Sequence, residues 1–262
     1  MKTILINLLL GAACLMPSAA APLESAEITT AVNDVRVYRG SQSGASASIG
    51  QRVGGKDDLH TGRRSRAELK FPDESLTRIG ANSIFSFRSG SRDMEIKQGS
   101  FLLQVPKNAG GATIRTATVT AAITGTTTMM EYNPGQWIKF ITLEGTAKLK
   151  LNSGGEYVDV PAGKMIFMRL TDKRIPLPIM INIQKLVGTS NLLGKDFEKL
   201  RPEADELVKK TIEEQNQARN DGEVTPAGVI NGGPTIRKGG GRDPNSSSVP
   251  TAPNSPNIII ND

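Results

Sequence analysis

The stretch ATIRTATVTAAITGTTTMMEY, residues 112–132, carries one basic and one acidic side chain and is dense in Thr, Ala, Val and Ile. β-Branched residues lose side-chain freedom in a helix and pack well on a pleated sheet, so the stretch predicts strands rather than a long helix. Gly125, between Thr124 and Thr126, predicts a bend, a bulge or a close backbone approach within a strand pair. A segment this apolar needs cover on both faces. We therefore expect it at the centre of an all-β core.

The composition is compatible with one β domain plus appendages. The 262 residues include 27 Gly and 15 Pro but only 4% aromatic residues, which predicts frequent turns and a core of small aliphatic side chains. The net charge of +6 suits an anionic partner or surface. The alternative, solvated Lys and Arg on strand faces, is favoured because the charge is dispersed.

Residues 1–21 have the pattern of a secretory signal peptide. Lys2 precedes the largely apolar run Ile4–Met16, and Pro17 and the small residues Ser18–Ala21 follow. The apolar run is too short to span a bilayer as a stable helix. We expect export to the periplasm or the cell exterior, with no transmembrane segment after cleavage; an uncleaved N-terminal anchor is the alternative.

Cys14, the only cysteine, lies inside this segment. Lipidation of Cys14 is an alternative fate, although Gly11 stands where lipoprotein signals usually have Leu. After cleavage the chain would have no thiol nucleophile, disulfide or cysteine metal site. His60 is the only histidine and is expected to be a surface or satisfied residue. We expect no metal and no cofactor.

Residues 22–172 alternate short apolar patterns with turn signals. On one strand, Ala67, Leu69 and Phe71 share a face while charged residues take the other. Further strands are expected at 35–37, 76–79, 83–87, 94–97, 101–105, 113–123, 127–132, 137–143, 146–151, 157–160 and 165–170. Many short strands at this spacing predict a sandwich, a barrel or a β-solenoid.

The character changes over residues 173–222. An extended connector is expected over Ile175–Ile183, followed by an amphipathic helix over Leu192–Asn220 with Pro202 and acidic residues in an early turn. Residues 223–262 are rich in Gly, Pro, Ser and Asn and predict a disordered tail. Its Ile258–Ile260 triplet is either a sticky tail, the favoured interpretation, or a strand that adds to a partner's sheet.

A set of short motifs in residues 50–79 resembles the FecR domain, which is known from bacterial iron-dicitrate-type envelope regulators. The residues that carry the resemblance are Gly50, Val53, Asp57, Thr61-Gly62, Ser65, Ala67-Glu68-Leu69, Phe71, Asp73 and Ser75-Leu76. Ile123-Thr124-Gly125-Thr126 is similar to the family's Val-Arg-Gly-Thr element, and Leu143-Glu144-Gly145 and Pro161-Ala162-Gly163 are similar to its closing glycine turns. The resemblance covers roughly residues 35–169.

The resemblance implies an extracytoplasmic, all-β sensing or protein-binding module. Its structural motif residues in this chain are Gly62, Asp73, Gly125, Thr126, Gly145 and Gly163. Two positions depart from the family pattern, because Glu74 replaces the usual Gly of an Asp-Gly-Ser turn and Thr124 stands where Arg is common. Typical members also carry a cytoplasmic anti-sigma segment and a membrane helix before the domain, whereas this chain has the expected signal peptide.

Few residues suggest chemistry. Asp57-Asp58 with Asp73-Glu74 could form a glycosidase-like pair or a calcium site, but acidic residues are ordinary in turns. Arg63–Arg66 is the densest basic patch and is interpreted as a solvated strand face; without interleaved aromatics and after export, nucleic acid is not an expected partner. Trp137 is expected in the core or at its rim, with ligand stacking as the lesser possibility. We expect no catalytic residues.

The hypothesis from sequence is an exported, non-enzymatic FecR-like module that binds an envelope protein or surface ligand in signalling or envelope organisation. One alternative is a structural protein that assembles on the surface through stacked strands. The other is a secreted polysaccharide-active enzyme on a β-solenoid.

Overall fold

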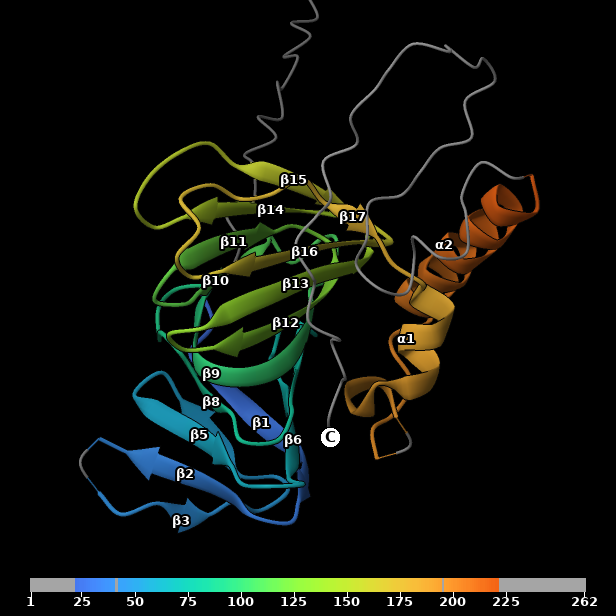
Figure 1. The fold of residues 1–262 in the computed structure, drawn as a ribbon. Helices are drawn as coiled ribbons and strands as arrows, with labels where there is room; N and C mark the ends of the chain where they lie inside the picture. The colour runs from blue at the N-terminus through green and yellow to red at the C-terminus, as the bar shows by residue number, and fades with distance from the viewer. Residues whose placement is uncertain (1–21, 41, 195, 222–262) are drawn as a thin grey trace, which may run out of the picture.

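The computed structural model describes residues 22–40, 42–194 and 196–221 as a strand-rich fold with a helical C-terminal part (Figure 1). The expected signal peptide with Cys14 and the expected tail with Ile258–Ile260 lie outside the described residues. The strands are β1 Ser25–Val32, β2 Val35–Arg39, β3 Ala45–Ser46, β4 Arg52–Gly54, β5 Asp57–Thr61, β6 Arg66–Lys70, β7 Leu76–Ile79, β8 Ile84–Phe87, β9 Asp93–Gln104, β10 Ala112–Arg115, β11 Val119–Ile123, β12 Thr127–Asn133, β13 Trp137–Glu144, β14 Thr146–Leu151, β15 Val158–Pro161, β16 Lys164–Arg169 and β17 Ile179–Met180.

These strands form two facing layers that share β9. One layer, called here the covered sheet, has the order β4-β1-β6-β7-β9-β12-β13-β16-β17. The other, called the outer sheet, has the order β3-β2-β5-β8-β9-β10-β11-β14-β15. Pairing is antiparallel throughout except between β9 and β10. The chain crosses between the layers every one or two strands, so the all-β prediction of stacked short strands is confirmed.

Strand β9 belongs to both layers and connects them. Its first half pairs with β8 and β10, and its second half, from Gly99, pairs with β7 and β12. Gly99 has a φ of 97°, and a Cβ there would lie 2.5 Å from Cα of Ser83. Only glycine tolerates that bend and that approach. Gly99 is therefore a bend inside one continuous strand.

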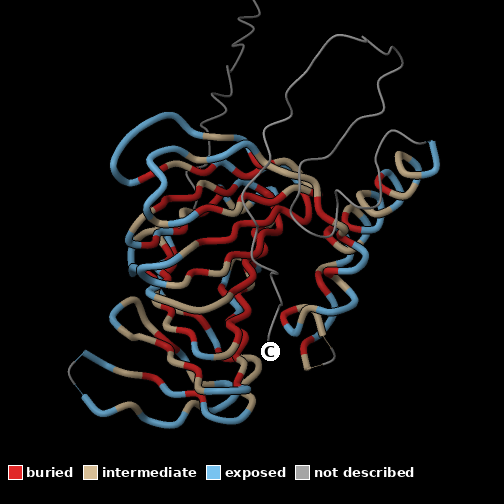
Figure 2. Tube along the Cα trace, in the orientation of Figure 1, coloured by how far each residue is buried: buried red, intermediate tan, exposed pale blue. Residues whose placement is uncertain are grey.

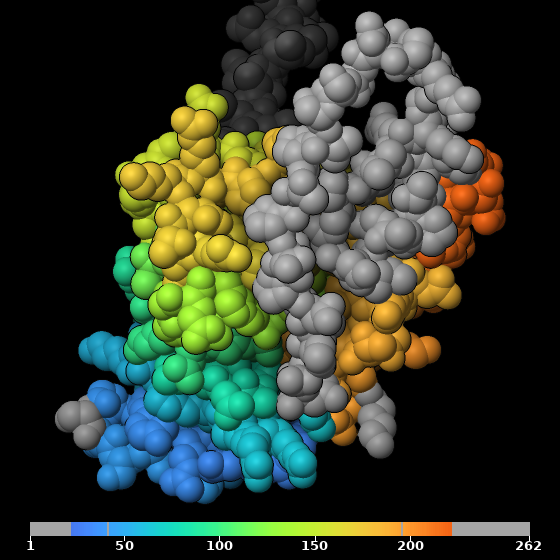
Figure 3. All heavy atoms as spheres, in the orientation of Figure 1, coloured from blue at the N-terminus to red at the C-terminus, as the bar shows by residue number. Residues whose placement is uncertain are grey.

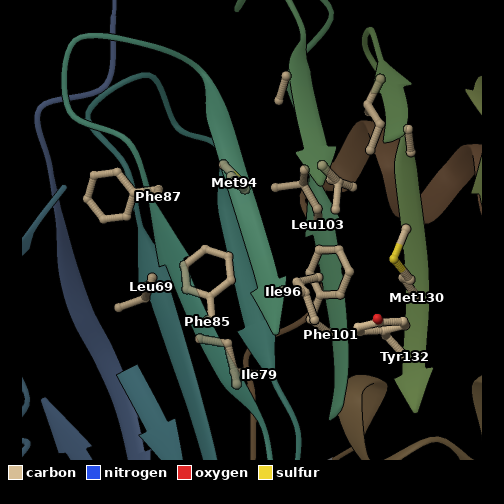
Figure 4. Packing of buried hydrophobic residues seen from close by; sticks show 14 of the residues in the cluster. Leu69, Ile79, Phe85, Phe87, Met94, Ile96, Phe101, Leu103, Met130 and Tyr132 are labelled. Carbon is tan, nitrogen blue, oxygen red and sulfur yellow. The ribbon is translucent and has the colours of Figure 1, made fainter. Parts of the chain in front are cut away.

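The main core fills the space between the layers (Figure 4). One row of inward-facing side chains runs across the covered sheet from strand to strand and is almost fully buried: Ala67, Ile79, Phe101, Met130, Phe140 and Ile166. Phe71 and Phe87 add an edge-to-face contact between the layers, with ring centroids 5.2 Å apart. Aromatic pairs favour this geometry.

Residues 112–132 form three strands, β10, β11 and β12, where two were expected. The expected strand 113–123 is interrupted because Thr116 turns the chain. Its Oγ1 accepts hydrogen bonds from the backbone N–H groups of Thr118, at 3.2 Å, and Val119, at 3.0 Å. The expected burial of both strand faces is found for β12, whose side chains are all buried or half-buried. Arg115 on β10, in contrast, is exposed.

The structure also contains a first strand that the sequence did not predict. β1 pairs with β4 and β6, and its Ala26 and Ile28 are buried. The register shifts between Ile28 and Thr30, and this irregularity breaks the period-two pattern that would have indicated the strand.

The helical arm comprises α1 Ile183–Thr189, the 3₁₀ turn η1 Asn191–Leu193 and α2 Pro202–Asn220. The prediction of one helix over Leu192–Asn220 was wrong in its first ten residues. Pro202 is the first helical residue of α2, and the residue before a proline avoids the α conformation, so Arg201 is extended with a ψ of 144°. The helix ends at Asn220, as expected.

The arm packs on the outward face of the covered sheet and forms a second apolar cluster there. The sheet contributes Leu102, Met129, Ile141, Leu143 and Met165. The chain from β17 to α2 contributes Ile181, Ile183, Leu186, Leu192, Phe197, Leu200, Ala204 and Val208. Buried residues are accordingly found in the strands and also in the arm (Figure 2). In the space-filling view the strand region runs from blue through yellow along the molecule, with the orange arm at its side (Figure 3).

Candidate functional site

A row of outward-facing residues on the covered sheet anchors the arm. The row follows the strand register from β6 to β16: Glu68, Arg78, Leu102, Met129, Ile141 and Met165. Its apolar members belong to the cluster under the arm. Its polar end is a buried ion pair, in which Arg78 Nε lies 2.8 Å from Glu68 Oε2.

Arg78 joins the sheet to the arm. Its Nη1 donates to the carbonyl of Leu192 at 3.0 Å, its Nη2 donates to the carbonyl of Glu198, and its guanidinium lies 4.8 Å from the ring centroid of Phe197. Glu68 also accepts a 2.7 Å hydrogen bond from Thr29 Oγ1. Because a buried charge is costly without partners, this set of contacts holds the arm in one position. No sequence pattern distinguishes Arg78 from an ordinary outward residue of a short strand.

The next outward row is not filled by the arm and forms a groove, called here the arm groove. Along β7, β9, β12 and β13 this row runs through Gly80, Ser100, Glu131 and Lys139. Gly80 and Ser100 are small, and a Cβ at Gly80 would overlap Oγ of Ser100. The hollow holds about 470 Å³, and α1 and η1 border it with Leu186, Ser190 and Leu192. This volume is typical of ligand-binding clefts.

Trp137 stands in the wall of the arm groove and is half-buried. Its ring lies 5.8 Å from the ring of Phe167, and the Lys139 ammonium lies 5.7 Å from the indole. Lys139 is also ion-paired with Glu131. The indole is therefore held in place while one side of it lines the open space.

The basic patch Arg63–Arg66 lies at one end of the arm groove, which Arg64, Ser65 and Arg66 line. Ser65 is buried, and its Oγ accepts from the N–H of Asp34 at 3.0 Å. Arg66 is ion-paired with Asp196 of the arm, yet its Nε–H is buried without an acceptor. Arg64 has a φ of 57°, and its carbonyl accepts from Asn33 Nδ2 at 2.6 Å. The patch therefore faces a cleft at its C-terminal end, which the spacing of the sequence did not indicate.

Residues 57–148 match the family model described as FecR protein. Two crystal structures, at 1.65 and 2.50 Å resolution, of a "putative anti-sigma factor" from Parabacteroides distasonis ATCC 8503 are also similar to this chain. In each comparison the identity is 14% and the TM-score 0.40, and the match covers 45% of this chain and 57% of that chain. No curated protein matches the chain significantly.

Residues 57–148 are a FecR domain. The resemblance predicted from the sequence is thus confirmed over this range, which runs from the start of β5 into β14. The strand residues that form the floor of the arm groove belong to the FecR domain, whereas Leu186, Ser190 and Leu192 of the arm lie beyond it. In the part of the chain that the structure describes, no helix has the length and apolar character needed to cross a bilayer.

Three of the expected turn glycines lie close to other parts of the chain, two of them within residues 57–148 and Gly163 beyond that range. Gly125 has a φ of 60° and packs against Lys107, whereas Gly145 has a φ of 79° and packs against Thr126. Thr126 is buried, its carbonyl accepts from the N–H of Val105 at 3.0 Å, and its Oγ1 has no hydrogen-bond partner. Gly163 has a φ of 77°, and its carbonyl accepts from the N–H of Ile181 at 3.1 Å.

Gly62 and Asp73 lie in turns at opposite ends of β6. The N–H of Gly62 donates to the carbonyl of Asp34 at 2.8 Å. Asp73 accepts from the N–H and the hydroxyl of Ser75, at 3.0 and 2.8 Å, and is ion-paired with Arg92. Both residues hold turns of the FecR domain, and neither lines the arm groove.

Glu74 shows why FecR domains favour glycine in this turn. Its φ is 64°, in the left-handed region that costs a residue with a side chain roughly 1–2 kcal/mol. Its carboxylate lies 2.7 Å from Nζ of Lys70 in an exposed ion pair, which offsets little of that cost. Glu74 therefore departs from the family's sequence while keeping the backbone shape of the turn.

The other residues considered for catalysis or metal binding each contact a different partner. Asp57 accepts from the N–H of Gly54 at 2.9 Å, whereas Asp58 is ion-paired with Lys97 at 2.8 Å. His60 stacks on Tyr38 with ring centroids 4.1 Å apart, and burial lowers the pKa of its imidazole. Among the described residues, no three of His, Cys, Asp and Glu are placed to hold a metal ion.

Proposed function

We propose that this chain is an exported, non-enzymatic module of envelope signalling that binds another envelope protein. The observation that carries the proposal is the FecR domain at residues 57–148, the region that also supplies the floor of the arm groove. A cleft formed by a rigid sheet and a packed arm suits binding, because its walls need no ordering when a partner arrives.

Export is part of the proposal and rests on the sequence of residues 1–21. The basic start, the apolar run and the small residues before Pro22 are typical of a secretory signal. A fusion of residues 1–30 to alkaline phosphatase tests it, since that enzyme is active only after export. Phosphatase activity is expected, and its loss is expected when Leu8→Arg and Leu9→Arg interrupt the apolar run.

We propose that the chain has no enzymatic activity, because each carboxylate that could act in catalysis is held by a different partner. Asp73 and Glu74 are bound to different cations, Arg92 and Lys70, and they lie on a different layer from Asp57 and Asp58. An acid–base pair needs two carboxyl groups that face one substrate. Reducing-end release from a panel of glycans would contradict the proposal if it were lost on Asp57→Asn or Asp73→Asn substitution.

Affinity capture from the envelope fraction of the source cells tests the binding role. The tagged chain is expected to recover a discrete protein, and untagged chain should compete for it in a saturable manner. Recovery of nothing beyond a tag-only control, under several growth conditions, would contradict the proposal.

A further inference from the structure

We propose that the arm groove binds an extended acidic segment of the partner protein that carries one large apolar side chain. This inference rests on the proposed function and deepens it, because it assigns the surface and the chemistry of the partner. It follows from the shape of the groove, its apolar lining and the charges at its end.

The apolar lining gives a place for a single large side chain. Met129 and Ile141 form the floor beside the cluster under the arm, Leu192 faces them from η1, and Trp137 forms a wall. The hollow exists because Gly80 and Ser100 are the small members of their row. A Leu, Phe or Trp side chain placed there would contact aliphatic and aromatic surface and lose its contact with water.

The charges of the lining favour an acidic segment. Three cationic residues, Arg64, Arg66 and Lys139, line the groove with one acidic residue, Glu131. Asp196 of the arm pairs with Arg66 from outside the lining, which leaves one uncompensated positive charge. Lys139 is already paired with Glu131 and Arg66 with Asp196, so a carboxylate of the partner is bound first by Arg64. Arginine binds carboxylates through parallel N–H donors, which adds geometric specificity.

Each of the two arginines has capacity for a further acceptor. Arg64 is exposed, no ion pair of its side chain is found among the described residues, and its backbone is fixed by the hydrogen bond from Asn33. Arg66 has the buried Nε–H without an acceptor, a state that costs roughly 1–3 kcal/mol. A carboxylate that reaches this Nε–H would share the guanidinium with Asp196, which already pairs with Nη2.

The chain's own residues 223–262 are the alternative occupant of the groove. They contain three acidic residues, Glu223, Asp243 and Asp262, and three basic residues, Arg237, Lys238 and Arg242. All three basic residues lie in residues 223–242, which therefore do not complement the positive charge of the groove, whereas residues 243–262 carry only Asp243 and Asp262. The proposed occupant is an acidic segment of another chain, and residues 243–262 are the competing occupant that the Ile258–Ile260 replacement below tests.

Selection from a random dodecapeptide phage library on the full chain after signal cleavage tests the proposal. Enriched peptides are expected to place Asp or Glu beside a Leu, Phe or Trp. A labelled copy of the best peptide should bind Arg64→Glu about tenfold more weakly, whereas the matched control Arg63→Glu should bind nearly as the parent does. Trp137→Ala should weaken binding, and Tyr157→Ala, an aromatic of the outer sheet, should not.

Several results would overturn the inference. These are no enrichment, enrichment of basic peptides, or equal binding by Arg64→Glu and Arg63→Glu when both unfold at the parent's temperature. Replacement of Ile258, Ile259 and Ile260 by Asp in the full chain should leave peptide binding unchanged; a severalfold increase would show that the tail occupies the groove. Capture of an envelope protein that is indifferent to Arg64→Glu would overturn this groove assignment and leave the proposed function standing.

Discussion

At Gly125 the chain combines a left-handed backbone with a close approach. The φ is 60°, and a Cβ at this position would lie 2.8 Å from Cα of Lys107. Gly135, in the turn between β12 and β13, has a φ of 77° but no heavy atom within 4 Å of the corresponding Cβ. The two glycines share a conformational requirement and differ in packing, so they form a matched pair.

Gly125→Ala is expected to lower the free energy of unfolding more than Gly135→Ala does. Each substitution carries the left-handed cost of roughly 1–2 kcal/mol, and Gly125→Ala adds about 1–3 kcal/mol because Lys107 backbone must move. Urea unfolding of the two variants measures the difference. Equal losses, or a Gly125→Ala or Gly125→Val variant as stable as the parent, would show that the glycine is not required by packing.

At the residue scale the sequence could predict such turns but not the strand breaks beside them. Gly125, Gly145 and Gly163 were expected to be turn residues because of their dipeptide context and the FecR resemblance, and each has a positive φ. The break at Thr116 was missed because threonine favours strands and its turn depends on a hydrogen bond of the side chain, which has no distinct pattern.

The element that most depends on a single contact is the helical arm, through Arg78. Arg78→Met is expected to destabilise the protein by about 3–5 kcal/mol, because it leaves the buried Glu68 carboxylate unpaired and two arm carbonyls without donors. It should also expose residues 196–201 to trypsin, which cuts after Lys199; the Arg201–Pro202 bond is resistant because proline follows the arginine. Urea unfolding and timed proteolysis measure the two effects.

The control for Arg78→Met is Lys209→Met, which removes an exposed cation of α2 paired with Asp205 at 2.8 Å. Exposed pairs contribute about 0–1 kcal/mol, so this variant should be close to the parent in both measurements. The double variant Arg78→Met/Glu68→Gln should recover part of the loss, because the unpaired charge is gone. If Arg78→Met unfolds like the control, the arm is held by the apolar cluster alone.

A second buried carboxylate gives the start of α2 a pH dependence. Glu144 is buried at the end of β13, and burial raises its pKa above the ordinary 4.5 despite the 3.1 Å hydrogen bond from Thr127 Oγ1. Gln104 donates to the same hydroxyl at 3.4 Å and accepts from the N–H of Arg201 at 3.3 Å. The carboxyl group is therefore connected to the residue that precedes the helix.

Glu144→Gln is expected to gain stability relative to the parent as the pH rises. The folded-state pKa lies above the unfolded one, so the stabilising contribution of Glu144 is full below pH 4.5 and is lost as the pH rises through the folded pKa. The amide keeps an acceptor for Thr127 and does not titrate. Urea unfolding of both proteins from pH 4 to pH 8 measures the difference, and a constant difference would contradict a raised pKa.

At the scale of elements the sequence predicted most of the longer strands and α2, but not β1, β5 or α1, nor how the arm attaches. The period of three and four residues from Leu193 to Leu207 indicated an apolar face, and most of these residues do pack on the covered sheet. Phe197 and Leu200 also pack in this apolar cluster, but they lie in an irregular segment, to which a helical period does not apply. The Arg78 contacts span more than a hundred residues, and no local pattern encodes them.

For the whole molecule, the FecR resemblance predicted the type of module, whereas the arm groove became visible only in three dimensions. Its floor comes from four strands and its border from α1 and η1, so its residues are scattered from Arg64 to Leu192. The row of Gly80 and Ser100 that keeps it open depends on strand register, which single sequences do not fix. We propose that this groove, in the envelope, is where the partner binds.

Photocrosslinking in living source cells tests that claim most directly. A photoreactive phenylalanine is placed at Pro134 or Asn191, exposed residues that line the arm groove, or at Lys148, which is exposed on the outer sheet. The same discrete envelope-protein adduct is expected from Pro134 and Asn191, and none is expected from Lys148. No adduct from either groove position, or a stronger adduct from Lys148, would contradict it.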